Sequence, residues 1–348
     1  MKIAPMIREM EKYPEVFEQF LVHTGQHYDP GMSQVFFNEL DLPSPDINLE
    51  VGSGTHTWQT AQVMLRIEPV LLDYKPDWVN VVGDVNSTLA CALVCGKLGV
   101  RVAHVEAGLR SFDKTMPEEI NRRLTDQIAD LLFTPSKDGD QNLLNEGVPA
   151  NKIRFVGNVM IDTLVRLLPK AQDRWDALRS RYGLKDYLLV TLHRPSNVDQ
   201  PETLREIISA LGQVSDEIPV LFPVHPRTHQ RLSDFGLSSA ASNLNLLEPL
   251  GYLDFLALQA HATLVLTDSG GIQEETTYLG IPCLTARANT ERPITITSGT
   301  NRLVDSSCKA LVEGIRRTLS NGTQEKRKPP LWDGKAAERI VGAYLEIA

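Results

Sequence analysis

The fold is decided by an apolar run that leads into a double-glycine turn and then into a helix with early carboxylates. The stretch reads Ala262-Thr263-Leu264-Val265-Leu266, followed by Thr267-Asp268-Ser269-Gly270-Gly271-Ile272-Gln273-Glu274-Glu275. A strand that runs into a helix N-terminus leaves unpaired backbone N–H groups at the turn, which suits a phosphate or diphosphate. The carboxylates fit such a site only if one reaches past the phosphate to a sugar hydroxyl, which indicates a nucleotide sugar. An ordinary strand–helix turn with acidic residues near the helix start explains the pattern equally well.

The composition is that of a soluble globular protein with about two domains. The chain has 348 residues, of which 42% are hydrophobic and 23% charged. A net charge of −9 argues against a large nucleic-acid-binding face. The four cysteines form no Cys-x-x-Cys pair and are too sparse for a disulfide scaffold. Because no apolar run is long enough for a bilayer and the start does not resemble a signal peptide, we expect a cytoplasmic protein without a membrane partner.

Short apolar runs alternate with helix-period segments, as in doubly wound parallel sheets. In the first half the expected strands are Phe20–His23, Trp78–Val82, Arg101–Val105, Leu131–Thr134 and Ile153–Val156, and the expected helices are Lys2–Lys12, Ser87–Leu98 and Glu118–Ala129. In the second half the expected strands are Tyr187–Leu192, Val220–Val224, Leu244–Leu247, Leu264–Leu266 and Cys283–Thr285, with helices at 201–214, 252–260, 272–279 and 307–319. We predict α/β domains at 1–165 and 166–330, a C-terminal helix in 331–348 that packs on the first domain, and an active site in the cleft between the domains.

Three motifs with ionisable residues follow strands of the first half. They contain Asp84, then Glu106, then Glu118 with Arg122. Each has a structural explanation, since Asp84 could be a turn residue and Glu118 a helix-start charge with Arg122 as its i+4 partner. Together they place three carboxylates and an arginine at one rim of the sheet, an arrangement that separates carboxylate pKa values for acid–base work.

The second half contributes a histidine and an arginine. His193 ends a predicted strand beside another arginine, and we favour a functional role over a structural one. Arg292 lies in a loop near the double-glycine turn, where it suits a phosphate or a sugar hydroxyl. The pair His225 and His229 has a spacing seen in metal-binding helices, but Pro226 interrupts it and a third ligand is lacking, so we expect no metal. No dinucleotide or Walker motif occurs, and we expect no cofactor.

In their order and length the motifs resemble those of the non-hydrolysing UDP-N-acetylglucosamine 2-epimerases. The matching segments cover nearly the whole chain and are Val82–Asp84, His104–Arg110, Pro117–Arg122, Asp268–Glu275 and Thr290–Pro293. The resemblance implies two Rossmann-like domains of the glycosyltransferase-B type, a homodimer, and interconversion of UDP-N-acetylglucosamine (UDP-GlcNAc) and UDP-N-acetylmannosamine (UDP-ManNAc). In this family UDP is thought to be eliminated to give a 2-acetamidoglucal and then added back, which needs an acid, a base and a stabilised diphosphate.

The resemblance also implies roles for individual residues. The catalytic set is Asp84, Glu106, Glu118, Arg122 and His193. The substrate-binding set is Lys2, Phe255 at the uracil, Ser269, Gly270 and Gly271 at the diphosphate, Glu275 at the ribose, and Arg292. The segment His23–His27 resembles a loop that in bacterial members lies near a second, activating UDP-GlcNAc, but it is too short to predict regulation.

Three alternatives stay open. The chain could epimerise another UDP-2-acetamido sugar, transfer a sugar as a glycosyltransferase, or bind a UDP-sugar without turnover. The family begins with a strand and a Gly-Thr-Arg-Pro-Glu turn ahead of a helix resembling Lys2–Pro5. We expect the coding sequence upstream of Met1 to encode both.

Overall fold

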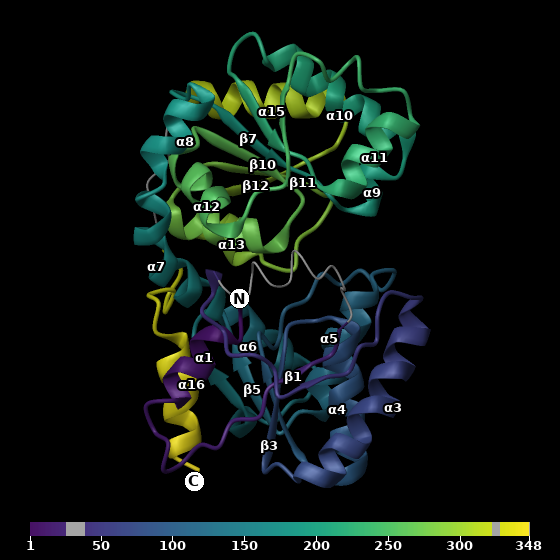
Figure 1. The fold of residues 1–348 in the computed structure, drawn as a ribbon, viewed down its shortest axis with the longest axis vertical. Coiled ribbons are helices and arrows are strands. Elements are labelled where there is room, and N and C mark those ends of the chain that lie inside the picture. Colours follow the sequence, from purple (N-terminus) through teal and green to yellow (C-terminus); the bar gives the residue numbers. More distant parts are fainter. Residues whose placement is uncertain (26–38, 322–327, 348) are drawn as a thin grey trace. The chain divides into compact units, whose positions relative to one another are not determined.

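The computed structural model describes residues 1–25, 39–321 and 328–347. They form two compact units, one of residues 1–163 with 330–348 and the other of residues 164–329 (Figure 1). The chain passes between them within α7 (Val159–Gln172), and returns to the first unit between α15 (Cys308–Asn321) and α16 (Ala336–Leu345). Both units are α/β with parallel sheets, which confirms the predicted fold class.

The first unit is built on a four-stranded parallel sheet. Its order is β3 (Trp78–Val82), β4 (Arg101–Val105), β5 (Leu131–Thr134) and β6 (Ile153–Phe155). The strands alternate in the chain with α4 (Asn86–Leu98), α5 (Pro117–Ile128) and α6 (Lys137–Asn145), and α3 (His56–Tyr74) packs on α4. The predicted bounds of β3, β4 and β5 are confirmed to the residue. Their valines and leucines suit strands of a parallel sheet.

The predicted strand Phe20–His23 was wrong in extent. Only β1 (Val22–His23) is a strand, and it pairs with β2 (Ile47–Asn48) in a separate two-stranded parallel sheet. The N–H of Leu21 donates instead to the carboxylate of Asp46 at 2.7 Å. A side chain thus takes the backbone group that a longer ladder would have used.

Two helices from opposite ends of the chain lie side by side against this first sheet (Figure 1). These are α1 (Ala4–Met10) and α16, and their apolar side chains share a core with Phe133 of β5. The carboxylate of Asp162 accepts hydrogen bonds from the N–H groups of Ala336 at 3.1 Å and Ala337 at 2.7 Å, so it caps the start of α16.

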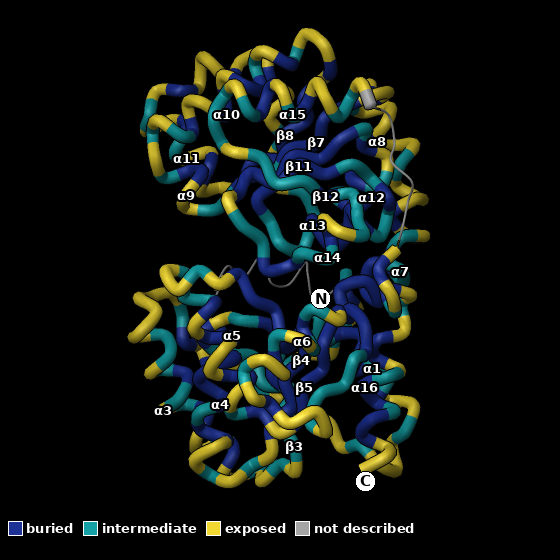
Figure 2. The backbone as a smooth tube through the Cα atoms, turned by 180° about the vertical axis from the view of Figure 1, so that it is seen from behind, coloured by how far each residue is buried: buried dark blue, intermediate teal, exposed yellow. Residues whose placement is uncertain are grey.

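The second unit has the strand order of a Rossmann sheet. Its six parallel strands run β9 (Asn245–Leu247), β8 (Val220–Pro223), β7 (Leu188–Thr191), β10 (Leu264–Thr267), β11 (Cys283–Ala286) and β12 (Asn301–Val304). The chain order reverses between β7 and β10, and such a switch point is where ligands of doubly wound sheets bind, at the carboxyl ends of the strands. Figure 2 shows that β7, β8 and β11 of this sheet are buried.

The helices of this unit complete its core and include the one that begins at the double-glycine turn. The remaining helices are α8 (Trp175–Tyr182), α9 (Pro195–Val198), α10 (Pro201–Val214), α11 (Pro226–Asp234), α12 (Tyr252–His261), α13 (Gly270–Leu279) and α14 (Ile294–Thr297). Helices α10 and α15 pack on each other and bury their leucines and isoleucines against the sheet. Across both units, no helix within the described ranges is long and apolar enough to cross a membrane.

Candidate active site

Two carboxylates of the first unit lie just after neighbouring strands. Asp84 follows β3 and Glu106 follows β4, at the same edge of the sheet. Glu106 has a left-handed backbone with φ of +74°, which is uncommon for a residue with a side chain and is concentrated at functional sites. Its N–H and that of Ala107 both donate to the carbonyl of Phe133 at 3.0 Å, so the neighbouring strand holds the turn in place.

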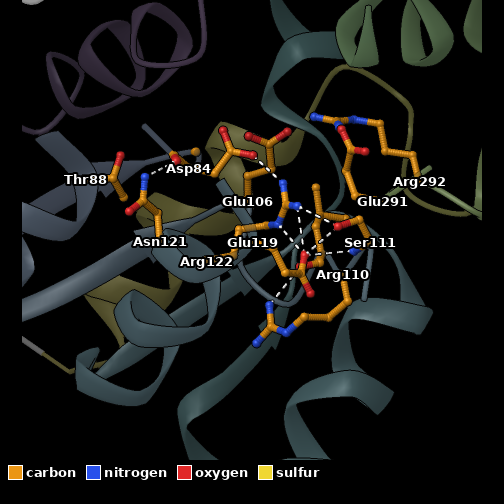
Figure 3. A network of polar contacts seen from close by, with 12 residues as sticks. Asp84, Thr88, Glu106, Arg110, Ser111, Glu119, Asn121, Arg122, Glu291 and Arg292 are labelled. Atoms are coloured by element: carbon orange, nitrogen blue, oxygen red, sulfur yellow. Dashed lines mark hydrogen bonds and ion pairs between the residues drawn. The ribbon is translucent and has the colours of Figure 1, made fainter. Parts of the chain in front are cut away.

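A buried arginine ties this edge to α5. Arg122 is 2% exposed and forms ion pairs with the carboxylates of Asp84 and Glu119, the latter at 2.8 Å (Figure 3). Glu119 also accepts the N–H of Ser111 at 2.8 Å. Burial alone would raise the pKa of Glu119, but the N–H of Ser111 and the guanidinium lower it below the ordinary value. Arg122 is therefore fixed in place by two carboxylates.

The adjacent carboxylate, Glu118, is held by none of these groups. It is half-buried in the first turn of α5 and makes no hydrogen bond or ion pair with the described part of the chain. The suggested i+4 pairing of Glu118 with Arg122 is wrong, because the helical partner of Arg122 is Glu119 at i–3. The two neighbours differ by about 100° around the helix, so one faces the arginine and the other does not.

Lys2 contacts the second catalytic candidate directly. Its ammonium group forms an ion pair with the carboxylate of Glu106. Gly83, with φ of +72°, leaves space for both groups, since a Cβ there would lie 3.1 Å from Nζ of Lys2 and 3.3 Å from Oε2 of Glu106. The structure thus brings Lys2, Asp84, Glu106 and Arg122 together within the first unit.

In the second unit, a buried carboxylate orients the predicted histidine. Asp268, after β10, lies 3.0 Å from Nδ1 of His193, which follows β7. It also accepts the N–H of Arg194 at 2.9 Å and the side-chain amide of Asn197 at 3.0 Å. Burial alone would raise the pKa of Asp268, but His193 and these donors lower it. The imidazole, 43% exposed, is held by Nδ1 in the way that a carboxylate orients a catalytic histidine.

The double-glycine turn forms the start of α13, with Ser269 as its first flanking residue. No described side chain caps this N-terminus, so its N–H groups remain available to an anion. A Cβ at Gly270 would lie 2.5 Å from Nη1 of Arg292, so the missing side chain lets the guanidinium lie against the turn. Arg292 donates to Glu274 at 2.7 Å and forms an ion pair with Glu291. Ser269, Gly270, Gly271 and Arg292 therefore lie together.

Glu275 is buried one turn into the same helix. The hydroxyl of Tyr252 donates to its Oε1 at 2.8 Å, while Oε2 has no hydrogen-bond partner among the described residues. Burial, with the nearby charge of Glu274, raises the pKa of Glu275 to about 7. Phe255, the predicted uracil contact, is half-buried on α12, the helix that carries Tyr252.

The chain matches a known protein family over nearly its whole length. A family model described as UDP-N-acetylglucosamine 2-epimerase matches residues 8–345.

The chain belongs to the UDP-N-acetylglucosamine 2-epimerase family.

It is 45% identical to the UDP-N-acetylglucosamine 2-epimerase of Methanocaldococcus jannaschii over 98% of this chain and 94% of that protein. It is 42% identical to the UDP-2,3-diacetamido-2,3-dideoxy-D-glucuronate 2-epimerase of Pseudomonas aeruginosa over 95% of this chain and 92% of that protein. The crystal structure of the M. jannaschii enzyme in complex with UDP-GlcNAc and UDP matches with a TM-score of 0.91 and 44% identity, covering 99% of this chain and 96% of that one.

These matches confirm the predicted family and its epimerase class. The individual roles of the site residues, and the placing of both sets at one cleft, stay predictions. The resemblance at His23–His27 lies partly outside the described residues, from Gln26 onward. Within the described ranges, no group of three or more histidine, cysteine, aspartate or glutamate residues is arranged to hold a metal ion.

Sequence reasoning missed the residues that hold the site residues in place. These are Glu119 and Ser111 at Arg122, Asp268 at His193, and Glu274 and Glu291 at Arg292. For Glu119 a signal existed, because an i,i+3 spacing to Arg122 is as good a helical pairing as i,i+4. For Asp268 the signal is long-range, since it depends on the pairing of β10 with β7.

Proposed function

We propose that this chain interconverts UDP-GlcNAc and UDP-ManNAc. The observation that carries the proposal is the match to the M. jannaschii structure, which was solved with UDP-GlcNAc and UDP bound. The residues of the two units supply the required chemistry. One set groups carboxylates with cations, and the other offers a helix N-terminus with an arginine and an oriented histidine.

The reaction requires a proton to leave carbon 2 and the diphosphate to depart from carbon 1. Carbon 2 has no adjacent carbonyl to acidify its proton, so elimination needs a positioned base and strong stabilisation of the leaving group. We assign proton transfer to the carboxylates Asp84, Glu106 and Glu118, with Arg122 and Lys2 fixing two of them. Glu118, which no described residue holds, is the one best able to approach a substrate.

The leaving UDP is assigned to the second unit. Ser269, Gly270 and Gly271 offer N–H groups to the diphosphate, with Arg292 and His193 beside them as charged or hydrogen-bonding partners. Glu275 accepts ribose hydroxyls through its unpartnered oxygen, and Phe255 packs on the uracil. No step of this scheme uses a metal or an organic cofactor.

One observation supports a second candidate substrate, a UDP-2,3-diacetamido-glucuronate. The P. aeruginosa relative that acts on the diacetamido-glucuronate sugar is nearly as similar to this chain as the M. jannaschii enzyme. A panel of UDP-GlcNAc, UDP-ManNAc and UDP-2,3-diacetamido-glucuronate separates the two. We expect kcat/KM for UDP-GlcNAc to exceed that for the uronate by roughly 100-fold, as a site unsuited to an extra charged group would require. The reverse ranking would assign the chain to the uronate sugar.

We further propose a homodimer and a cytoplasmic location. Trp58, Leu65 and Leu72 are exposed at seven-residue intervals along α3, a spacing typical of helix–helix contacts. All four cysteines are free thiols, as in a reducing compartment. Sedimentation of the chain and of Leu65→Asp tests the dimer, which we expect the substitution to dissociate. A wild-type monomer at micromolar concentration would contradict it.

A further inference from the structure

A buried histidine lies beneath the turns that carry the two strand-end carboxylates. His104, on β4, is 0% exposed. Its Nδ1 lies 2.6 Å from the carboxylate of Asp126 on α5, and its Nε2 lies 2.8 Å from the carbonyl oxygen of Gly83 after β3. The ring therefore bridges α5 and the end of β3 from a position inside the sheet.

The partners of the ring determine its charge. A carbonyl oxygen cannot donate, so Nε2 must carry a proton. The proton at the other contact belongs either to Nδ1 or to Asp126. Asp126 also accepts the N–H of Gly108 at 3.1 Å and lies 2.7 Å from the guanidinium of Arg110. These groups favour a carboxylate, which leaves Nδ1 protonated as well.

The surrounding charges balance an imidazolium. Arg110, itself buried, is bound on its far side by Glu146 at the end of α6, with contacts of 2.9 and 2.7 Å. The sequence of groups is cation, anion, cation, anion, running from His104 through Asp126 and Arg110 to Glu146. Burial alone would raise the pKa of Asp126, but His104 and Arg110 lower it. A buried charge paired on each side in this way avoids the cost of an isolated ion.

The pair contacts both catalytic turns. His104 holds the carbonyl of Gly83, the residue before Asp84, and Asp126 holds the N–H of Gly108, two residues after Glu106. Gly83 and Gly108 both have left-handed backbones, so both turns leave ordinary strand geometry at these residues. Besides its backbone hydrogen bonds to a neighbouring strand, each turn forms one hydrogen bond with the His104–Asp126 pair.

We propose that His104 is a positioning residue, which with Asp126 fixes the turns that aim Asp84 and Glu106. The catalytic part of this proposal rests on the proposed function, whereas the two hydrogen bonds of the ring do not. His104 touches no substrate in this scheme and acts through the backbone of Gly83. Loss of the pair should move the reacting carboxylates without removing the groups that bind UDP.

The two ring hydrogen bonds are measured on the unaltered full-length chain by ¹⁵N NMR of labelled histidine. His104→Gln assigns its signals among the eight histidines. We expect both ring nitrogens of His104 to carry hydrogen-bonded protons, and the Nδ1 signal to change in Asp126→Asn, which removes the carboxylate acceptor. Absence of a proton on Nε2 in the unaltered chain would overturn the proposal whether or not the variants fold.

The positioning role is measured by kinetics of folded variants. We expect His104→Gln and Asp126→Asn to lower kcat by about 100-fold with KM changed less than about threefold, because small displacements of reacting groups act on the chemical step. His229→Gln, at an exposed histidine, serves as the matched control. A folded His104→Gln protein with wild-type kcat would refute the role. If the unaltered chain turned over no UDP-sugar, the proposed function would fail, and the nitrogen signals would still test the hydrogen bonds of His104.

Discussion

At the residue scale, neighbouring carboxylates of the site differ in what holds them. Glu119 accepts from Ser111 and Arg122 and is 1% exposed, whereas Glu118 has no such contacts within the described chain. The contacts of Glu119 hold Arg122 in place, whereas a carboxylate without such contacts can exchange protons with a ligand. We therefore propose Glu118 for the chemistry and Glu119 for support.

This contrast predicts opposite effects for two isosteric substitutions. Glu118→Gln should leave the free energy of unfolding within ~0.5 kcal/mol of wild type, as for sites without buried partners, but lower kcat by about 10²–10⁴-fold. Glu119→Gln should cost roughly 1–3 kcal/mol of stability, because buried Arg122 loses a charged acceptor. Denaturant unfolding and initial rates measure both. Wild-type turnover by Glu118→Gln would remove that residue from the chemistry.

Glu275 predicts a pH effect of definite sign. Its folded pKa of about 7 exceeds the ordinary 4.5, so the folded state binds the proton more tightly than the unfolded state. Its contribution to stability is therefore complete below pH ~4.5 and is lost as the pH rises through 7. Binding shows the opposite trend, because only the carboxylate accepts two ribose hydroxyls.

We expect KM for the UDP-sugar to rise as the pH falls from 8 to 6. In Glu275→Gln, KM should be high and independent of pH over this range, since the group no longer ionises. Steady-state kinetics in buffers of constant ionic strength measures both proteins. A pH profile shared by wild type and Glu275→Gln would show that another group controls binding.

At the element scale, the start of α13 depends on the absence of a side chain at Gly270. A Cβ there would lie 2.5 Å from Nη1 of Arg292 and 3.0 Å from Oε1 of Glu291, so Gly270→Ala should displace the arginine. We expect KM to rise about 10-fold or more, as for loss of a charge-assisted contact of ~1.5–3 kcal/mol. Gly212→Ala on α10 is the control, since no described atom lies within 4 Å of its Cβ position. Equal KM values for both variants would show that Arg292 does not contribute to substrate binding.

The elements that could be predicted from the sequence are those whose pattern is local. Strands such as Trp78–Val82 are marked by runs of valine and bounded by glycine, and their limits match. Helix α3 was not predicted, because Pro69 and polar residues interrupt its pattern and tertiary packing on α4 sustains it. Strand β12 was also missed, because Asn301–Val304 is short and only its pairing with β11 makes it a strand.

For the site as well, residues in local motifs could be predicted, whereas roles that depend on tertiary contacts could not. Motif order identified Asp84, Glu106 and Arg122, which the structure does bring together. The sequence could not distinguish Glu118 from Glu119, because that depends on which side of α5 faces Arg122. The roles of His104 and Asp268 depend on partners 22 and 75 residues away, which no local pattern encodes.

At the scale of the whole molecule, the family match covers nearly the full chain and each unit carries its own part of the predicted site. The first unit supplies carboxylates and cations at the edge of a parallel sheet. The second supplies a helix start without a side-chain cap at the switch point of a Rossmann sheet. The reaction we propose, proton transfer at carbon 2 with reversible loss of UDP, uses both.

That reaction has a direct isotopic signature. The purified chain is incubated with UDP-GlcNAc in heavy water, and the nucleotide sugars are analysed by NMR and mass spectrometry. We predict formation of UDP-ManNAc and entry of one deuterium at carbon 2 of both sugars, because the proton removed there exchanges with solvent before its return. Recovery of UDP-GlcNAc alone, with hydrogen retained at carbon 2, would contradict the account and leave a protein that binds UDP-sugars without epimerising them.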